Sequence, residues 1–280
     1  MKQWLSELMD LGLVPYVATS KAFVPHLDLS LFEGHEVVKL LEDPKERNFH
    51  EAYLVSNSLG FGNPELKMPN WVYIDCVLMQ SAVIGFALPI SKAPDSLISF
   101  YEDDPYVEIN ALDYIPVSGQ IAALGIDGQM LTGFSLFSLR RQLASMNIPK
   151  LAAFTKFAAL HVYKAEEKIK FTGLSQYDNK ALKTHALFGE KMYIDQTIMP
   201  LHPLNEMSFT YSMKVTLNES RLSGEFLKQE DEYDFLLKSD DTVTKQGMQN
   251  RIDSGERFYI TSPIHIEKED GLYLPICLEK

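Results

Sequence analysis

The chain has 280 residues, and its 26 Lys and Arg against 38 Asp and Glu leave a formal net charge of −12. A balance this acidic argues against a nucleic-acid scaffold, which needs clustered Lys and Arg for its phosphate contacts. Hydrophobic residues at 46% and charged residues at 23% are ordinary for a globular chain and exclude wholesale disorder. The two cysteines, Cys76 and Cys277, lie far apart in apolar runs, so we expect two buried, reduced thiols and no disulfide.

The first twelve residues have the apolar spacing of a short amphipathic helix. Glu7 and Asp10 interrupt the apolar stretch, so it lacks the core of a secretory signal peptide. No window of the sequence reaches the ~18 uncharged apolar residues that a membrane span needs. We therefore expect a cytoplasmic protein with a small-molecule ligand and neither a membrane nor a nucleic-acid partner. A homo-oligomer stays an open alternative.

Strands are predicted for most of the segment between residues 49 and 127. Residues 50–57 are rich in strand formers, and residues 71–90 are long enough for two strands that turn near Gln80 and Ser81. An acidic turn at 102–105 precedes further strand material, which ends at 121–127. Prolines interrupt the mixed pattern of residues 13–48 before these strands.

Two helices are expected next. One covers about 130–146 and carries Arg140 and Arg141 in its C-terminal half, where cations suit the helix dipole. The other covers about 150–166 and is apolar around most of its circumference, which predicts burial.

A strand at 168–174 follows, and then a helix from an Asp178 N-cap to about 188, closed by a left-handed Gly189. Residues 192–201 and 207–217 read as strands. The charged segment 219–256 is expected at the surface, with an acidic cluster near residues 230–234. The last residues predict a hairpin that turns at 269–271.

The predicted fold class is therefore α+β, with a mostly antiparallel mixed sheet, a central helical segment and additional C-terminal strands. Three parts are expected: an N-terminal helix and irregular segment (1–48), a central α+β core (49–200) and a β-rich extension (201–280). A dinucleotide-binding fold is excluded, because no GxGxxG motif stands between a strand and a helix.

The turn after the strand at 121–127 is a candidate anion site. A glycine-containing turn that leads into a helix presents free backbone N–H groups and the positive end of the helix dipole to a phosphate. The sequence places Gly125 and Gly128 here and predicts that the helix starts near Gln129 to Gly133. The alternative is that these glycines only end a strand.

The segment that contains His185 resembles the GCN5-related N-acetyltransferase superfamily over about residues 70–197. In that family a helix carries the pattern N-x-x-A-x-x-x-Y-x-x-x-G-F. Aligning Asp178 with the Asn keeps the spacing and puts Ala181 at the Ala, His185 at the Tyr, Gly189 at the Gly and Glu190 at the Phe. The identities at the Asn, Tyr and Phe positions therefore differ from the pattern, and an additional helix precedes this segment.

The family also has a central strand that leads into a Q/R-x-x-G-x-G/A turn around the coenzyme A pyrophosphate. The matching turn here is 129–134, in which Gln129 keeps its place and Gly133 lies one position late. A GNAT-like core would thus bind acetyl-CoA or another acyl-CoA as a substrate. The residues implied to bind it are Gly125, Gln129, Thr132, Gly133, Phe134 and Asp178.

The resemblance implies transfer of an acyl group to a small amine or amino-acid acceptor. The family's Tyr commonly gives a proton to the leaving thiolate, and His185 could do the same, because imidazole titrates near neutral pH. The general base would be Asp75, Glu108 or no side chain at all. The alternative for His185 is a surface position near the end of a helix.

Two other functions stay open. A decarboxylase or lyase that acts on a small carboxylic acid would need an activated Lys or a cationic pocket, which could include Arg140 and Arg141. A non-catalytic protein could use the same elements to bind a small ligand or a partner. No metal site is predicted, because the histidines lack the HxH, HxxxH or HExxH spacing.

Overall fold

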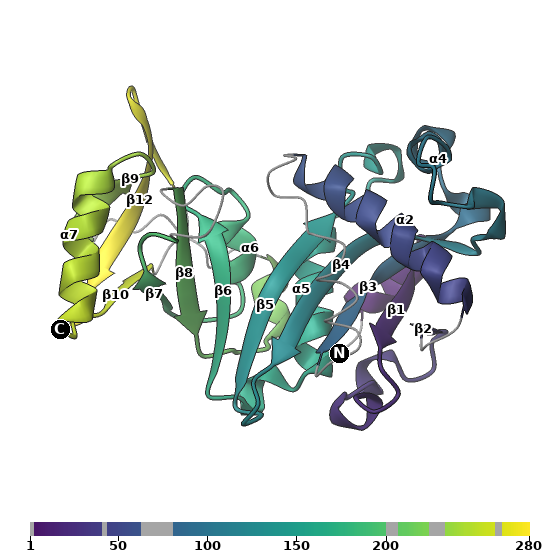
Figure 1. Ribbon diagram of the computed structural model, residues 1–280, viewed down its shortest axis with the longest axis horizontal. Helices are drawn as coiled ribbons and strands as arrows, with labels where there is room; N and C mark the ends of the chain where they lie inside the picture. Colours follow the sequence, from purple (N-terminus) through teal and green to yellow (C-terminus); the bar gives the residue numbers. More distant parts are fainter. Residues whose placement is uncertain (1–2, 41–43, 63–80, 200–206, 224–232, 261–264) are drawn as a thin grey trace. The chain divides into compact units, whose positions relative to one another are not determined.

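The computed structural model describes residues 3–40, 44–62, 81–199, 207–223, 233–260 and 265–280 (Figure 1). These residues form two compact units. The N-terminal unit consists of Met1–Gly125 and Gly133–Lys164, and the C-terminal unit of Ile126–Thr132 and Ala165–Lys280. The expected strand at 71–80, with Asp75 and Cys76, lies outside the described residues, and so does most of the acidic cluster near residue 230.

The N-terminal unit contains a sheet in the order β2-β1-β3-β4-β5. β1 pairs in parallel with β2 and antiparallel with β3, which pairs antiparallel with β4. The strands are β1 (Val14–Thr19), β2 (Val38–Leu40), β3 (Ser81–Pro89), β4 (Tyr114–Leu124) and the part of β5 (Met130–Ser138) that follows Thr132. The helices are α1 (Gln3–Asp10), α2 (Pro44–Phe61), α4 (Asp95–Glu102) and α5 (Leu151–Val162). Short 3-10 turns lie at Val24–His26, Ser30–Phe32, Ile90–Lys92, Ile109–Ala111 and Ala144–Met146.

Helices α2 and α5 cover opposite faces of this sheet. A Cβ added to Gly119 of β4 would lie 2.7 Å from the Tyr53 ring of α2. The neighbouring Ser118 instead accepts a 2.7 Å hydrogen bond from the Thr155 hydroxyl of α5. Because successive residues of a strand point to opposite faces, the two helices lie on either side of β4.

The structure corrects the prediction of a strand at 50–57, since these residues belong to α2. Phe49, Ala52, Tyr53 and Ser56 are all buried, and their spacing of three and four is the period of a helix that has one face on a core. The strand formers of this segment therefore serve a helix, because tertiary burial outweighs intrinsic propensity. The helix expected at 150–166 is confirmed as α5, and so is its burial.

The helix expected at 130–146 is wrong, because residues 130–138 form strand β5. Its side chains alternate, with Leu131, Ser135 and Phe137 buried and Phe134 exposed. The turn before β5 is a hairpin turn, in which the Asp127 carboxylate accepts a hydrogen bond from the backbone N–H of Gln129 at 2.9 Å. Gly128 has φ +68°, a conformation that favours glycine.

The sheet of the C-terminal unit begins with Met130–Thr132 of β5, which pair in parallel with residues 170–172 of β6. The order continues β6-β8-β7-β10-β12-β11, and β9 also pairs with β12. All pairings after β5 are antiparallel. The strands are β6 (Lys170–Gln176), β7 (Met192–Gln196), β8 (Ser208–Met213), β9 (Phe235–Lys238), β10 (Phe258–Ile260), β11 (Ile266–Lys268) and β12 (Gly271–Leu278). The helices are α6 (Leu182–Ala186) and α7 (Thr242–Asp253), and 3-10 turns lie at Ala165–Glu167 and Glu219–Ser223.

Several C-terminal predictions are confirmed, namely the strands β6, β7 and β8 and the hairpin of β11 and β12. The helix α6 is shorter than expected: its N-cap is Ala181, not Asp178, and Gly189 is not left-handed. Helix α7 was not predicted. The Asp241 carboxylate caps it by accepting the Thr244 N–H, and Lys245 and Met248 are buried on its inner side.

The described chain is thus a mixed α+β protein whose strand pairings are mostly antiparallel, as predicted. None of its described helices combines the length and the apolar character that crossing a membrane requires.

His50 makes the stability of the protein depend on pH. Burial and the nearby Arg47 lower the pKa of His50 to about 4, whereas an unfolded His titrates near ~6.5. Between these two values the unfolded chain binds a proton that the folded chain does not, so the free energy of unfolding falls as the pH drops from 6.5 to 4. We expect His50→Gln to reduce this slope in urea titrations over that range. The exposed His26, changed to Gln, is the control, and an equal slope in both variants would contradict the prediction.

Candidate functional site

The helix α6 places His185 against strand β8 within the C-terminal unit. Its ring Nδ1 lies 3.0 Å from the hydroxyl oxygen of Tyr211, and the two ring centroids are 5.5 Å apart. Tyr211 is 1% exposed, whereas His185 is half-buried. The contact therefore joins a partly accessible imidazole to a buried phenol through one of its two nitrogens.

Glycine at position 173 makes room for this pair. Gly173 of β6 lies directly opposite Tyr211 of β8 in the strand register. A Cβ at position 173 would lie 2.6 Å from the Tyr211 hydroxyl oxygen and 2.7 Å from the adjacent ring carbon. Any larger side chain would push the tyrosine away, so glycine is required by close packing.

Tyr211 also packs against a row of aromatic side chains. Its ring lies 6.3 Å from Phe209, which stacks on Tyr177 at 4.6 Å. The Lys245 Nζ lies 4.5 Å from the centre of the Tyr177 ring, a cation–π contact. Burial raises the pKa of Tyr177 and of Tyr211, so both hydroxyls stay protonated at neutral pH.

Asp178 lies just before α6 but does not cap it. The Asn179 carboxamide oxygen instead accepts a hydrogen bond from the backbone N–H of Ala181 at 2.9 Å. Asp178 is half-buried and belongs to the same unit as His185.

The residues predicted to bind the pyrophosphate do not lie at the start of a helix. Gln129 lies in the hairpin turn, and Thr132, Gly133 and Phe134 lie in β5. The Thr132 hydroxyl forms a 3.0 Å hydrogen bond with that of Thr172. Gly125 lies at the start of the same turn, at the end of β4. These residues therefore lack the gathered, unpaired N–H groups of a helix N-terminus, which was the physical basis of the prediction.

The segment between β5 and α5 carries exposed cations. It runs from Leu139 to Lys150 in the N-terminal unit and leads from a strand into a helix. Arg140, Arg141 and Lys150 are exposed, and the side chain of the N-cap residue Lys150 makes no capping hydrogen bond. Arg140 and Arg141, which were expected in the C-terminal half of a helix, follow strand β5 instead.

Of the two candidate bases, the structure describes only Glu108. Glu108 is exposed in the N-terminal unit, where its backbone N–H donates to the Asn48 side chain and its carbonyl accepts from it, both at 2.8 Å. Asp75 lies outside the described residues.

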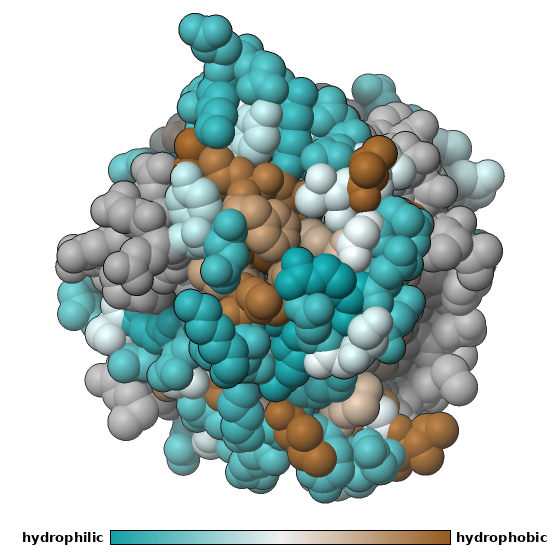
Figure 2. Space-filling view, turned by 90° about the vertical axis from the view of Figure 1, so that its left-hand side faces the viewer, coloured by the Kyte–Doolittle hydropathy of each residue, from teal (hydrophilic) through white to brown (hydrophobic). Residues whose placement is uncertain are grey.

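A shallow pocket of about 200 Å³ lies at the surface of the C-terminal unit, lined by Tyr193, Ile194, Asp195, Ile252, Gly255, Glu256, Arg257 and Phe258. Figure 2 shows the side of the molecule that bears α7, with hydrophobic residues gathered near the middle and hydrophilic residues around them.

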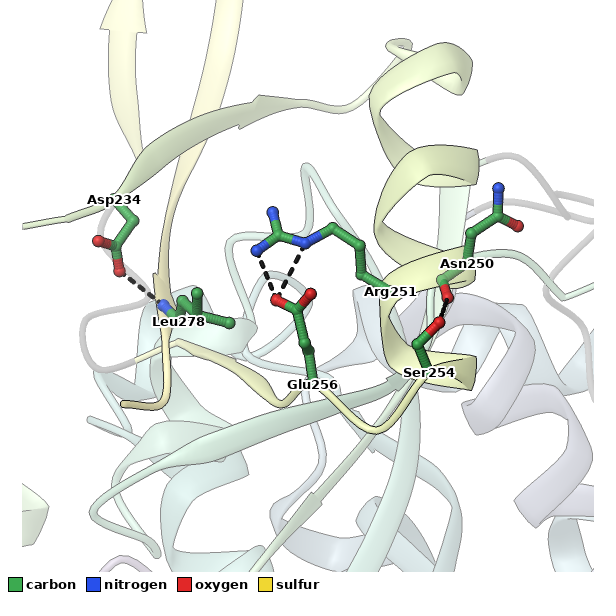
Figure 3. A network of polar contacts seen from close by, with 6 residues as sticks. All are labelled: Asp234, Asn250, Arg251, Ser254, Glu256 and Leu278. Atoms are coloured by element: carbon green, nitrogen blue, oxygen red, sulfur yellow. Dashed lines mark hydrogen bonds and ion pairs between the residues drawn. The ribbon is translucent and has the colours of Figure 1, made fainter.

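Charged groups at this pocket pair with one another. Arg251 donates from Nε and Nη2 to one oxygen of Glu256, at 3.0 and 2.5 Å (Figure 3). The Glu279 carboxylate accepts from the Tyr193 hydroxyl at 2.6 Å and pairs with Arg257 at 2.9 Å. In the same figure Asp234 accepts from the backbone of Leu278, and Ser254 donates to the carbonyl of Asn250. We interpret these ion pairs and hydrogen bonds as structural contacts at the surface of the C-terminal unit.

Two lysines, Lys156 and Lys245, are fully buried. Burial lowers the pKa of Lys156 well below its ordinary value, which would make a lysine nucleophilic. Both side chains are 0% exposed, however, so a substrate does not reach either of them. Among the described residues, no cluster of three or more His, Cys, Asp or Glu is arranged to hold a metal ion.

No model of a known protein family matches the chain, and a comparison with curated proteins finds no match either. The functional assignment therefore depends on the geometry of the residues described above.

Proposed function

We propose that the protein transfers an acyl group from an acyl-coenzyme A to a small amine or amino-acid acceptor. The observation that carries the proposal is the contact of His185 with Tyr211 at Nδ1. In the proposal Nε2 is the nitrogen that transfers the proton, at the position where the resemblance implies an acid.

The order of the elements supports the same proposal. The segment 178–190 follows strand β6 in the chain and contains helix α6, where the resemblance requires a helix further on from a strand.

In the proposed reaction His185 acts as a general acid. The neutral amine of the acceptor attacks the thioester carbonyl, and the tetrahedral intermediate breaks its C–S bond. The thiolate that leaves takes a proton, which His185 gives from Nε2 as a general acid. The base that accepts the proton of the attacking amine stays a prediction from the sequence: Asp75, Glu108 or no side chain at all.

The site of the coenzyme A phosphates stays the one that the resemblance implies, around the turn that contains Gln129. Gln129 and Thr132 belong to the C-terminal unit, as His185 does. Gln129 is exposed in this turn, so its carboxamide is accessible to a phosphate oxygen.

Thermal unfolding with and without millimolar acetyl-CoA tests this binding. A ligand that binds only the folded state stabilises it by ~2.7 kcal/mol at a hundredfold excess over Kd, which corresponds to a rise of several degrees in Tm. We expect this rise in the native chain and a smaller rise in Gln129→Ala, which removes a side chain that the resemblance places at the phosphates.

Gln246→Ala is the matched control, because Gln246 is also an exposed glutamine but lies in α7 and bonds to Asn250. Absence of a shift in the native protein at saturating acetyl-CoA would overturn the proposal. A shift without any acyl transfer to amine acceptors would favour the non-catalytic ligand-binding alternative.

A further inference from the structure

One partner of His185 is the buried hydroxyl of Tyr211. The Tyr211 oxygen lies 3.0 Å from Nδ1, and its ring is packed between Phe209, Phe171 and the His185 ring at centroid distances of 5.5 to 6.3 Å. Gly173 leaves the space that the hydroxyl occupies. Packing against these residues of β6, β8 and α6 thus fixes the position of the Tyr211 hydroxyl oxygen.

We propose that Tyr211 is a positioning residue: its hydroxyl oxygen accepts a hydrogen bond from Nδ1–H of His185 and so keeps Nε2 as the nitrogen that releases and regains the proton. The hydrogen bond made by one ring nitrogen sets which nitrogen carries the proton in the neutral ring. The proposal rests on the proposed function, because the proton transfer sets the direction of this hydrogen bond, whereas the position of the proton on the ring can be measured without any substrate.

The direction of this hydrogen bond follows from the proton transfer. The charged imidazolium carries hydrogen on both nitrogens, so Nδ1 can only donate in that state. After Nε2 has released its proton, the ring still carries hydrogen on Nδ1. Only an oxygen that accepts from Nδ1–H keeps the same hydrogen bond before and after the transfer, without any rotation of the hydroxyl.

A phenol also suits an acid better than a carboxylate would. A carboxylate beside His185 would stabilise the imidazolium and make it a weaker acid. Because burial raises the pKa of Tyr211, its hydroxyl stays uncharged and does not have this effect. The ring is therefore oriented without losing its tendency to release the proton.

Nitrogen NMR of the protein labelled with ¹⁵N-histidine tests the proposal without any substrate. The chain has 7 histidines, and the signals that disappear in His185→Gln identify those of His185. At about pH 8, above the ~6.5 of an ordinary histidine, we expect the native protein to carry the hydrogen on Nδ1. A native spectrum with the hydrogen on Nε2 would overturn the proposal by itself.

Two variants remove the contact in different ways. Tyr211→Phe deletes the hydroxyl, and Gly173→Ala displaces it, so both should shift the His185 signals toward the form with hydrogen on Nε2. Tyr193→Phe is the control, because the Tyr193 hydroxyl bonds to Glu279 and not to a histidine. An unchanged His185 spectrum in a folded Tyr211→Phe protein would also overturn the proposal.

Kinetics separate this inference from the function on which it rests. If the native protein transfers acyl groups, Tyr211→Phe should lower kcat roughly tenfold, a part of the 10²- to 10⁴-fold that acid–base catalysis supplies, with KM unchanged. Equal kcat in both proteins would overturn the positioning role. A native protein with the Nδ1–H ring but no turnover on any acyl-CoA would overturn the proposed function and leave the assignment of the proton intact.

Discussion

Replacing His185 by Ala is expected to lower kcat for acyl transfer by about 10²- to 10⁴-fold, the usual contribution of a positioned acid or base. The thiolate of coenzyme A would then have to take its proton from water. KM for the acyl-CoA should change little, because the residues implied to hold the coenzyme A phosphates, such as Gln129, lie outside α6. A fall in kcat at constant KM is the signature of an interaction made in the transition state.

Steady-state kinetics with acetyl-CoA and a panel of small amines would measure this effect. His26→Gln is the control, because His26 is exposed at the end of a 3-10 turn in the N-terminal unit. Unfolding curves should show that both variants are folded. His185→Ala also removes the hydrogen bond to the buried Tyr211 hydroxyl, so we expect it to lose about 1–3 kcal/mol of stability. Native turnover in a folded His185→Ala protein would remove His185 from the mechanism.

The second large effect is expected for Gly85→Ala, which should destabilise the protein by about 3 kcal/mol or more. A Cβ at position 85 would lie 2.0 Å from the carbonyl oxygen of Ser118 on the neighbouring strand. It would also lie 2.7 Å from the Tyr16 hydroxyl, which itself donates a 2.8 Å hydrogen bond to that carbonyl. Backbone atoms of a paired strand cannot move aside without breaking the ladder, so β3 and β4 would have to separate.

Urea unfolding at neutral pH would test this prediction, with Gly247→Ala as the matched glycine control. Gly247 lies exposed inside α7, and a Cβ there would meet nothing within 4 Å. Its replacement should stabilise the protein by roughly 0.5–1 kcal/mol, because alanine loses less entropy than glycine in a helix. Two variants of equal stability would contradict the close approach of β3 and β4.

Part of the fold could be predicted from local pattern. The apolar run around α5 predicted a buried helix, and the alternation before and after it predicted β4 and β6. The errors at α2 and β5 have one cause. Each segment carries enough apolar residues for either period, and the choice depends on which face of the sheet it packs against.

The site could be predicted only in part. The position of His185 near the end of a short helix followed from the sequence, but its partner did not, because Tyr211 lies on a strand 26 positions later. Residue types at such a separation show no pattern that links them. The phosphate segment was expected at the start of a helix near 129–134, but these residues belong to a hairpin turn and to strand β5.

The sequence by itself determined the acidic surface balance, the mixed α+β class and the strands whose side chains alternate, because composition and periodicity are local properties of the chain. The tertiary structure decided which strands pair, which glycines are needed and which hydroxyl meets His185. Strand register brings Gly173 opposite Tyr211 and Gly85 opposite Gly119, and no local pattern encodes a register between distant segments.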